Sequence, residues 1–465
     1  MTSCKIHKIY GPPGTGKTTR LLELVKQYDI KKVGYFAFTR KAANEAKGRI
    51  NLPDKKLKYF QTLHAFAFHT LGLSEDSVMQ PYHYEDLGKI LGIRVNYVDK
   101  FNDQQIHYLT SDNIYFQIIN KMQNQDIEEY EDRDIDPGLL HHIIINLAEY
   151  KKKNNLLDFN DMIKRFVNKP ELCPNFDAVF IDEAQDLSPL QWMMYDILKT
   201  KTNNIYLAGD DDQAIFQWAG ADVTRFIEEP GTEQILTQSR RIPKSIQELS
   251  RVITERIQGI KVYKKYLPRE TEGRIEYVNN IGQLDLKKGK WLILARTNTR
   301  LKDIMKKLQE MGLYYQYKKG KSFKAKLYKT IVNYTRWTKG EPLEDNEIKD
   351  ILECCDSKPD KTKPWYEVFT AVSMVERDYL RHMLSNGEKL TEDARIKLST
   401  IHAAKGGEED SVVLILDNSK KIRDAIMHDH VKSDEEHRVW YVGATRAKNN
   451  LYLMRAKKER YGYQL

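Results

Sequence analysis

One stretch of the sequence decides the fold: Gly11-Pro12-Pro13-Gly14-Thr15-Gly16-Lys17-Thr18-Thr19. It matches the G-x-x-x-x-G-K-[ST] pattern, in which glycines let backbone amides and a helix N-terminus surround a phosphate group. A short alternating segment precedes the stretch, and a helical pattern of apolar residues follows it. The stretch therefore predicts a strand, a phosphate-binding loop and a helix, in preference to a plain glycine turn. Within the loop, we expect Lys17 to reach the β- and γ-phosphates of a nucleotide and the Thr18 hydroxyl to bind Mg²⁺.

A second site is predicted at the end of a later strand. Residues 177–181 have the apolar pattern of a buried strand, and Asp182 and Glu183 follow at its carboxyl end. That edge is where open α/β sheets bind ligands. We expect Asp182 to hold the Mg²⁺ ion, and Glu183 to orient and deprotonate the attacking water. An acidic helix N-cap is the alternative interpretation, but the phosphate loop upstream favours catalysis.

A third cluster, residues 209–213, follows another predicted strand at 204–208. Its amide side chain, Gln213, is suited to sense a γ-phosphate. Trp218 and Phe216 come a few residues later and could stack on bases, at about 1–3 kcal/mol per base. Aromatic residues at such spacing are often core residues, so Phe216 is equally compatible with a structural role.

The composition narrows the class of protein. Among 465 residues, 75 Lys and Arg face 66 Asp and Glu, which gives a net charge of +9. This excess is compatible with a polyanionic partner. The four cysteines, Cys4, Cys173, Cys354 and Cys355, lack the paired spacing of a zinc site, so no structural metal is expected. Because no long apolar run or signal segment is present, we expect a soluble, cytoplasmic protein without membrane contact.

With these motifs in their order, the sequence resembles the superfamily-1A DNA helicases of the UvrD/Rep/PcrA type. Two segments, 36–43 and 61–66, are similar to motifs of that family that contact single-stranded DNA. They imply DNA contacts by Phe38, Thr39, Arg40, Thr62 and His64. Trp218 is expected to join this set.

Later segments extend the resemblance. Residues 236–241 are similar to the motif whose final arginine, here Arg241, touches the γ-phosphate from the second motor domain. Residues 397–408 resemble the segment that joins DNA and ATP, which implies that His402 contacts DNA and Glu408 the ribose. Residues 439–447 are similar to the last motif and imply that Arg446 is the arginine finger, a group that can contribute about 10³–10⁵ in rate.

The resemblance implies an ATP- and Mg²⁺-dependent helicase that moves 3′ to 5′ on single-stranded DNA and acts at single-strand/duplex junctions. Possible partners are replication or repair proteins. Two alternatives remain: a translocase that strips bound proteins without efficient unwinding, and a nucleotide-switched DNA-binding module. The sequence also departs from the family. No glutamine lies among the residues before Gly11, where the family has a motif that contacts adenine. Arg240 stands where a tyrosine is common.

The expected fold class is α/β, with two RecA-like motor domains built on parallel sheets flanked by helices. The first motor domain is expected at 1–75 and 151–228, with a helical insertion at 76–150. The second is expected at 229–340 and 391–465, with a small accessory insertion at 341–390. Between 311 and 340 many lysines alternate with aromatic residues and no acidic residue occurs. This stretch fits either a nucleic-acid surface or a solvated helix face whose aromatic residues belong to the core.

Overall fold

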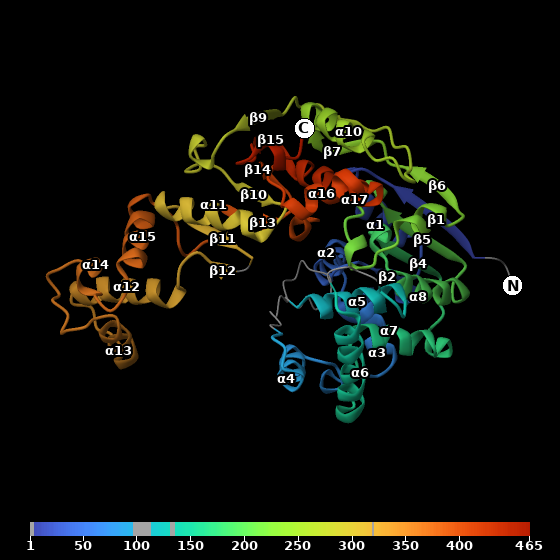
Figure 1. Ribbon diagram of the computed structural model, residues 1–465, viewed down its shortest axis with the longest axis horizontal. Helices are drawn as coiled ribbons and strands as arrows, with labels where there is room; N and C mark the ends of the chain where they lie inside the picture. The colour runs from blue at the N-terminus through green and yellow to red at the C-terminus, as the bar shows by residue number, and fades with distance from the viewer. Residues whose placement is uncertain (1–3, 96–112, 131–134, 319) are drawn as a thin grey trace. The chain divides into compact units, whose positions relative to one another are not determined.

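The computed structural model describes residues 4–95, 113–130, 135–318 and 320–465 (Figure 1). The chain forms two compact units. The first comprises Met1–Thr271 and Ile426–Val442, and the second comprises Glu272–Ala425 and Gly443–Leu465. Residues 229–271 therefore belong to the first compact unit, whereas the predicted second motor domain begins at 229. The boundaries of the motor domains, which concern function rather than compactness, stay a prediction.

The first unit contains a six-stranded sheet with the order β3-β2-β4-β5-β1-β6. Its strands are parallel throughout and have these bounds: β1 Lys5–Tyr10, β2 Val33–Phe36, β3 Phe60–Gln61, β4 Ala178–Asp182, β5 Asn204–Gly209 and β6 Thr232–Ile235. The strands expected at 177–181 and 204–208 are thus confirmed, shifted or extended by one residue. Because the strands are parallel, the loops after β1 to β5 all leave from the same edge of the sheet.

Helices cover both faces of this sheet. On one face, α1 (Lys17–Val25) and α2 (Arg40–Ile50) pack against the strands through residues such as Leu21, Val25 and Ala46. On the other face, α3 (Leu63–Thr70), α7 (Phe159–Val167) and α8 (Pro189–Thr200) contribute Phe66, Phe166 and other apolar residues. Layers of this kind are the standard way to bury both faces of a parallel sheet.

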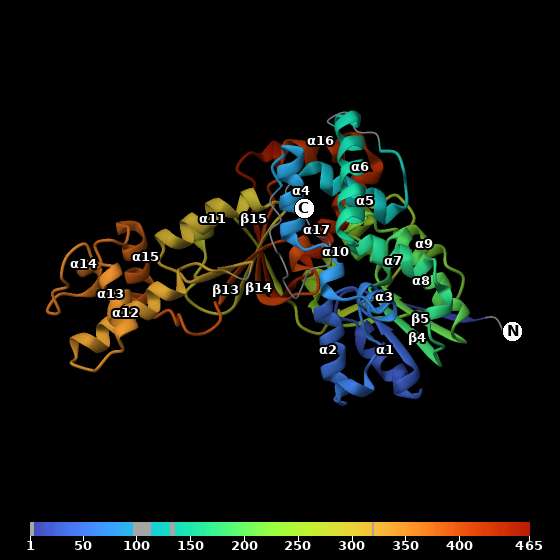
Figure 2. The same cartoon turned by 90° about the horizontal axis from the view of Figure 1, so that it is seen from below.

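Three helices form a separate apolar cluster within the same unit: α4 (Pro81–Leu91), α5 (Ile114–Gln125) and α6 (Pro137–Asn154). The helical periodicity expected in the insertion is confirmed for α5 and α6, whose buried residues include Ile118, Met122, Ile143 and Leu147. These helices are drawn in light blue and blue-green in Figures 1 and 2. The unit also contains α9 (Val223–Glu228), β7 (Gln238–Pro243), α10 (Lys244–Glu255) and β8 (Leu267–Arg269), and most of α17 (His430–Ala444).

The second unit has a seven-stranded sheet with the order β12-β11-β13-β10-β14-β15-β9. The strands are β9 Arg274–Val278, β10 Trp291–Ala295, β11 Tyr315–Tyr317, β12 Gly320–Lys321, β13 Ile396–Thr400, β14 Glu409–Ile415 and β15 Ala447–Met454. The pairs are parallel except β11 with β12. The expected α/β class, with parallel sheets flanked by helices, is confirmed in both units.

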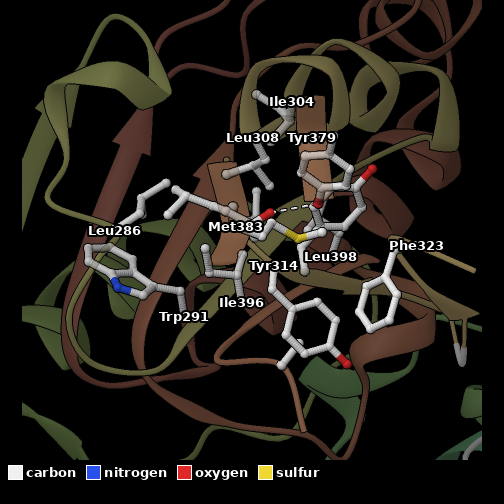
Figure 3. Close-up of a cluster of buried hydrophobic side chains, with 14 of the residues drawn as sticks. Leu286, Trp291, Ile304, Leu308, Tyr314, Phe323, Tyr379, Met383, Ile396 and Leu398 are labelled. Atoms are coloured by element: carbon white, nitrogen blue, oxygen red, sulfur yellow. Dashed lines mark hydrogen bonds between the residues drawn. The ribbon is translucent and has the colours of Figure 1, made fainter. Parts of the chain in front are cut away.

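Five helices contribute buried residues to the core of the second unit: α11 (Asn298–Glu310), α12 (Ala325–Thr338), α13 (Asp345–Glu353), α14 (Trp365–Val368) and α15 (Met374–Ser385). A further helix, α16, spans Lys420–His428. Buried residues from the predicted accessory insertion, such as Phe369, Tyr379 and Met383, lie in the same apolar cluster as Trp291 and Ile396 (Figure 3). The insertion therefore shares the core of the unit that carries it.

The structure decides between the two interpretations of residues 311–340. Tyr314, Tyr315, Phe323 and Tyr334 are buried in the core of the second unit, where Figure 3 shows Tyr314 and Phe323. Some of the interleaved lysines form ion pairs, Lys324 with Glu376 at 3.1 Å and Lys326 with Asp350 at 2.7 Å. For these aromatic residues a nucleic-acid surface is thus wrong, because their rings fill the core rather than face solvent.

Candidate active site

The predicted phosphate loop joins β1 to α1. Gly14 and Gly16 have positive φ angles of 76° and 88°, which a side chain at Cβ would disfavour. A Cβ atom on Gly11 would lie 2.4 Å from Oγ1 of Thr15 and 2.8 Å from Cγ of Lys17, so the loop closes tightly on itself. Nζ of Lys17 donates a 2.7 Å hydrogen bond to the Gly11 carbonyl. The ammonium group is therefore held over the loop at a helix N-terminus, an arrangement that fits a bound phosphate.

The loop is joined to the end of β4 by a hydrogen bond. Oγ1 of Thr18 donates to Oδ2 of Asp182 at 2.6 Å, and the hydroxyl of Tyr35 donates to the same oxygen at 3.0 Å. Burial, followed by the charge of Glu183, raises the pKa of Asp182. A buried carboxylate with a raised pKa gains from a nearby cation. Because hydroxyl and carboxylate oxygens are the ligands that Mg²⁺ prefers, these two residues fit a magnesium site.

Glu183 has an unusual backbone conformation, with φ 58° and ψ 43°. This left-handed conformation costs a non-glycine residue roughly 1–2 kcal/mol. The Glu183 amide donates to Oδ1 of Asp182 at 3.1 Å, and Nε2 of Gln185 donates to Oε2 of Glu183 at 2.5 Å. The Glu183 carboxylate is thus held by a fixed amide partner, at a strained residue position directly after the end of β4. This is a way to orient a general base.

The predicted γ-phosphate sensor, Gln213, lies in the short turn Asp211–Gln213 that follows the neighbouring strand β5. Nε2 of Gln213 donates to Oδ2 of Asp210 at 2.7 Å, and the Asp210 amide donates to Oε1 of Gln185 at 3.0 Å. Gln185 also contacts Glu183, so hydrogen bonds connect the sensor with the candidate general base. No local pattern in the sequence indicates the role of Gln185, because this role depends on the pairing of β4 with β5.

Arg241 lies beside the phosphate loop, in the same unit. Oγ of Ser239 donates to the Pro13 carbonyl at 2.8 Å, and the Arg240 amide donates to the Gly14 carbonyl at 2.9 Å. A Cβ atom on Gly14 would lie only 2.3 Å from Cβ of Arg241. The structure therefore brings Arg241 together with Lys17, Asp182 and Gln213 around the carboxyl edge of one sheet.

The candidate DNA-contacting residues of this unit divide into two kinds. Thr39 and Thr62 are N-caps of α2 and α3, and their Oγ1 atoms accept from the amides of Ala42 and Ala65 at 3.1 and 3.2 Å. Their capping role accounts for the threonines without reference to DNA. By contrast, Arg40 is exposed, and its charge is available to a phosphate backbone.

The aromatic candidates differ in burial. Trp218 is 42% exposed, whereas Phe216 is 4% exposed, which favours the structural role for Phe216. Its ring lies 5.4 Å from that of half-buried Phe38. His64 is buried, and burial, with a smaller effect of Arg40, lowers its pKa to about 4. His64 is therefore neutral near pH 7.

The remaining candidates, His402, Glu408 and Arg446, lie in the second unit. Arg446 is 1% exposed, and its guanidinium donates to the Gly407 carbonyl at 3.2 Å. Glu408 is exposed and directly follows Gly407. Arg446 therefore contacts the residue next to Glu408 in the sequence. Burial, with Arg296 and Lys405, lowers the pKa of His402 well below its usual range.

A phosphate loop, a Thr–Asp pair, a carboxylate after β4 and an amide after β5 define the P-loop NTPase class. Residues 2–232 match the model of the UvrD/REP helicase N-terminal domain. The chain belongs to the UvrD/Rep helicase family, as its motifs suggested.

Known proteins agree with this placement. The chain is similar to the ATP-dependent DNA helicase PcrA of Bacillus subtilis (strain 168), with 26% identity over 380 residues, 70% of this chain and 50% of that protein. It is also similar to the ATP-dependent DNA helicase Rep of Buchnera aphidicola, with 26% identity over 246 residues, 46% of this chain and 34% of that one. The chain thus spans about half the length of the PcrA proteins it matches.

Among solved structures, the helicase nonstructural protein 10 of an arterivirus aligns with 96% of this chain and 59% of its own, at 12% identity and a TM-score of 0.36. A score this low does not define the fold. In the described part of the chain, none of the helices is both long and apolar enough to cross a bilayer.

Proposed function

We propose that this protein hydrolyses ATP and uses the energy to move along single-stranded DNA and to unwind duplexes. The observation that carries the proposal is the 2.6 Å hydrogen bond between Thr18 and Asp182. It joins the phosphate loop to the end of β4, directly before Glu183. A protein that only binds nucleotide has no need of a second, oriented carboxylate next to the metal ligand. The similar proteins from Bacillus subtilis and Buchnera aphidicola are ATP-dependent DNA helicases, which agrees with the proposal.

In the proposed mechanism, the loop amides and Lys17 bind the phosphates. Thr18 and Asp182 would hold Mg²⁺, which supplies charge neutralisation at the phosphates when bound. Glu183 accepts the proton of the attacking water, and Gln185 keeps its carboxylate in place. Gln213 and Arg241 would reach the γ-phosphate, and their donors would stabilise the charge that develops there.

The proposed grip on DNA uses exposed rings and charges. The Trp218 ring is exposed enough to stack on a base, and Arg40 can pair with a phosphate. Trp218 follows Gln213 by only five positions in the sequence, so a change at the γ-phosphate is transmitted to the ring through a short segment. Three residues of the second unit complete the proposed mechanism. Arg446 contributes to hydrolysis, Glu408 binds the ribose, and His402 contacts DNA. A 3′ to 5′ direction and action at single-strand/duplex junctions, with replication or repair proteins as partners, complete the proposal.

The test is unwinding of labelled duplexes that carry only a 3′ or only a 5′ single-stranded tail, with ATP and Mg²⁺. Lys17→Ala serves as the control, because it removes the ammonium group over the phosphate loop. Unwinding from the 3′ tail alone, lost in Lys17→Ala, is the expected result. DNA-stimulated hydrolysis without unwinding would indicate a translocase that strips bound proteins, rather than a helicase. Nucleotide-dependent DNA binding without hydrolysis would indicate a nucleotide-switched DNA-binding module.

A further inference from the structure

The first unit contains a buried cluster of charges that the mechanism above does not use. Lys264, in the segment between α10 and β8, has a side chain that is 2% exposed. Its Nζ atom lies 3.3 Å from Oδ1 of Asp210 and 2.9 Å from Oδ2 of Asp212, and it also forms a short contact with Oδ1 of Asp211. The side chains of Asp210 and Asp211 are fully buried, and that of Asp212 is 11% exposed.

The cluster holds more negative than positive charge. Burial alone would lower the pKa of Lys264, but attraction by Asp212, Asp210 and Asp211 outweighs burial and raises it. Burial and the two neighbouring carboxylates raise the pKa of Asp212 to about 6, although Lys264 opposes them. Lys264 is therefore charged at neutral pH and is the cation that makes burial of these carboxylates tolerable.

Lys264 reaches the proposed sensor through a single carboxylate. Oδ1 of Asp210 contacts Lys264, and Oδ2 of the same group accepts from Nε2 of Gln213 at 2.7 Å. The Asp210 amide in turn donates to Gln185, the partner of Glu183. One ammonium group thus anchors the residue from which hydrogen bonds extend to both Gln213 and Glu183.

The segment that carries Lys264 is itself fixed at several points. The Val262 amide donates to Oδ2 of Asp211 at 2.9 Å. Arg438, from α17, donates to the carbonyls of Asp211 and Ile260 at 3.0 and 3.4 Å. The same stretch of chain begins with β7, which places Arg241 beside the phosphate loop. Arg241 precedes α10 in the sequence and Lys264 follows it. One continuous segment therefore carries both residues to the nucleotide site.

We propose that Lys264 is a positioning residue for hydrolysis, which holds Asp210 so that the Gln213 amide is aimed at the γ-phosphate. The inference rests on the proposed ATPase function and extends it to a residue outside the family motifs quoted above. A residue of this kind affects the rate of the chemical step more than ATP binding, because the phosphate loop remains intact.

The test is a double-mutant cycle in DNA-stimulated ATP hydrolysis with Lys264→Met, Gln213→Ala and the combined variant. Lys265→Met, an exposed neighbour, is the matched control. Lys264→Met is expected to lower kcat about 10- to 100-fold, on the scale of losing an outer-shell partner, with KM for ATP within about twofold. Because Lys264 acts through Gln213, the combined variant is expected to be no slower than Gln213→Ala.

A purely structural role gives a different result. If Lys264→Met lowers Tm, the cycle is repeated with the double variant Lys264→Met/Asp212→Asn in place of Lys264→Met. The double variant has the same net charge in the cluster as the wild type, and Asp212→Asn is its reference. Recovery of kcat in that double variant would overturn the proposal. The proposal would also be overturned if the reductions of kcat caused by Lys264→Met and Gln213→Ala multiplied in the combined variant. Hydrolysis by the wild type with an unaffected Lys264→Met would overturn this inference alone. No hydrolysis by the wild type would overturn the proposed function as well.

Discussion

Thr18 and Asp182 are 164 residues apart in the sequence, yet a 2.6 Å hydrogen bond joins their side chains. Thr18 is the second residue of α1 and Asp182 is the last residue of β4. The hydrogen bond therefore lies at the carboxyl edge of the sheet. Tyr35, from β2, contacts the same carboxylate oxygen. Three elements thus fix one oxygen atom next to the phosphate loop, and the proposed magnesium site depends on that convergence.

Replacement of Thr18 tests this site. Thr18→Ala removes the hydroxyl, whereas Thr18→Ser keeps it and removes only a methyl group. We expect Thr18→Ala to lower the rate of ATP hydrolysis at limiting Mg²⁺ by about 10- to 100-fold, and Thr18→Ser to stay near the wild type. The measurement is steady-state hydrolysis over a range of Mg²⁺ concentrations. Equal rates for all three proteins would contradict a metal-binding role of the hydroxyl.

Replacement of Glu183 tests the general base. Glu183→Gln keeps the size of the side chain and a carbonyl oxygen that can accept from Gln185, but it cannot accept a proton from water. We expect kcat to fall by about 10²–10⁴, the usual contribution of general-base catalysis, while the affinity for ATP stays near that of the wild type. Hydrolysis rates and nucleotide-binding titrations measure the two quantities separately. A Glu183→Gln protein with wild-type kcat would remove Glu183 from the mechanism.

The inserted helix α5 supports the turn that carries Trp218. Asn124, which is 1% exposed, donates through Nδ2 to the Ala219 carbonyl at 3.2 Å. Asn124→Ala leaves a buried carbonyl without that donor, at a cost of about 1–3 kcal/mol. We expect weaker binding of a single-stranded oligonucleotide, in the same direction as Trp218→Ala, with unchanged ATP affinity. Glu129→Ala, an exposed position beyond the helix, is the control. DNA affinity equal to that of the control would show that α5 does not set the position of Trp218.

The buried His64 gives the stability of the protein a dependence on pH. Its pKa is about 4 in the folded protein against 6.5 for the unperturbed group, with burial as the main cause and Arg40 as the nearby charge. The unfolded chain therefore binds a proton between these values and the folded chain does not. The stability that neutral His64 allows is fully present above pH 6.5 and is lost as the pH falls toward 4.

The corresponding measurement compares the wild type with His64→Gln in chemical unfolding at about pH 7 and about pH 5. Glutamine does not titrate, and the other histidines are common to both proteins. We expect acidification to reduce the free energy of unfolding of the wild type by about 2 kcal/mol more than that of the variant. An equal loss in both proteins would mean that His64 takes up its proton in the folded state.

Much of the first unit could be predicted from the sequence, because its signals are local. The phosphate loop requires glycines at set positions, and apolar runs that end in Asp182 or Asp210 are typical of buried parallel strands. Such patterns depend on neighbours in the chain and can be read from it directly. The positions of β4 and β5 follow from them to within a residue.

Other features depend on contacts that no local pattern reveals. Lys264 meets Asp211 across 53 positions of the sequence, and nothing around Lys264 distinguishes it from exposed Lys265. The aromatic residues of 311–340 have the same composition whether they face DNA or the core. Only the packing of Tyr314 and Phe323 against the second sheet decides the matter.

The most direct test of the central claim is the rate of ATP hydrolysis as single-stranded DNA is added, for the wild type and for Lys17→Ala. The proposed mechanism couples the γ-phosphate residues to the DNA-contacting segment around Trp218. It therefore predicts a rate that rises with DNA to saturation in the wild type and stays at background in Lys17→Ala. A wild-type rate that does not respond to single-stranded DNA would contradict the account of this protein as a DNA-dependent motor.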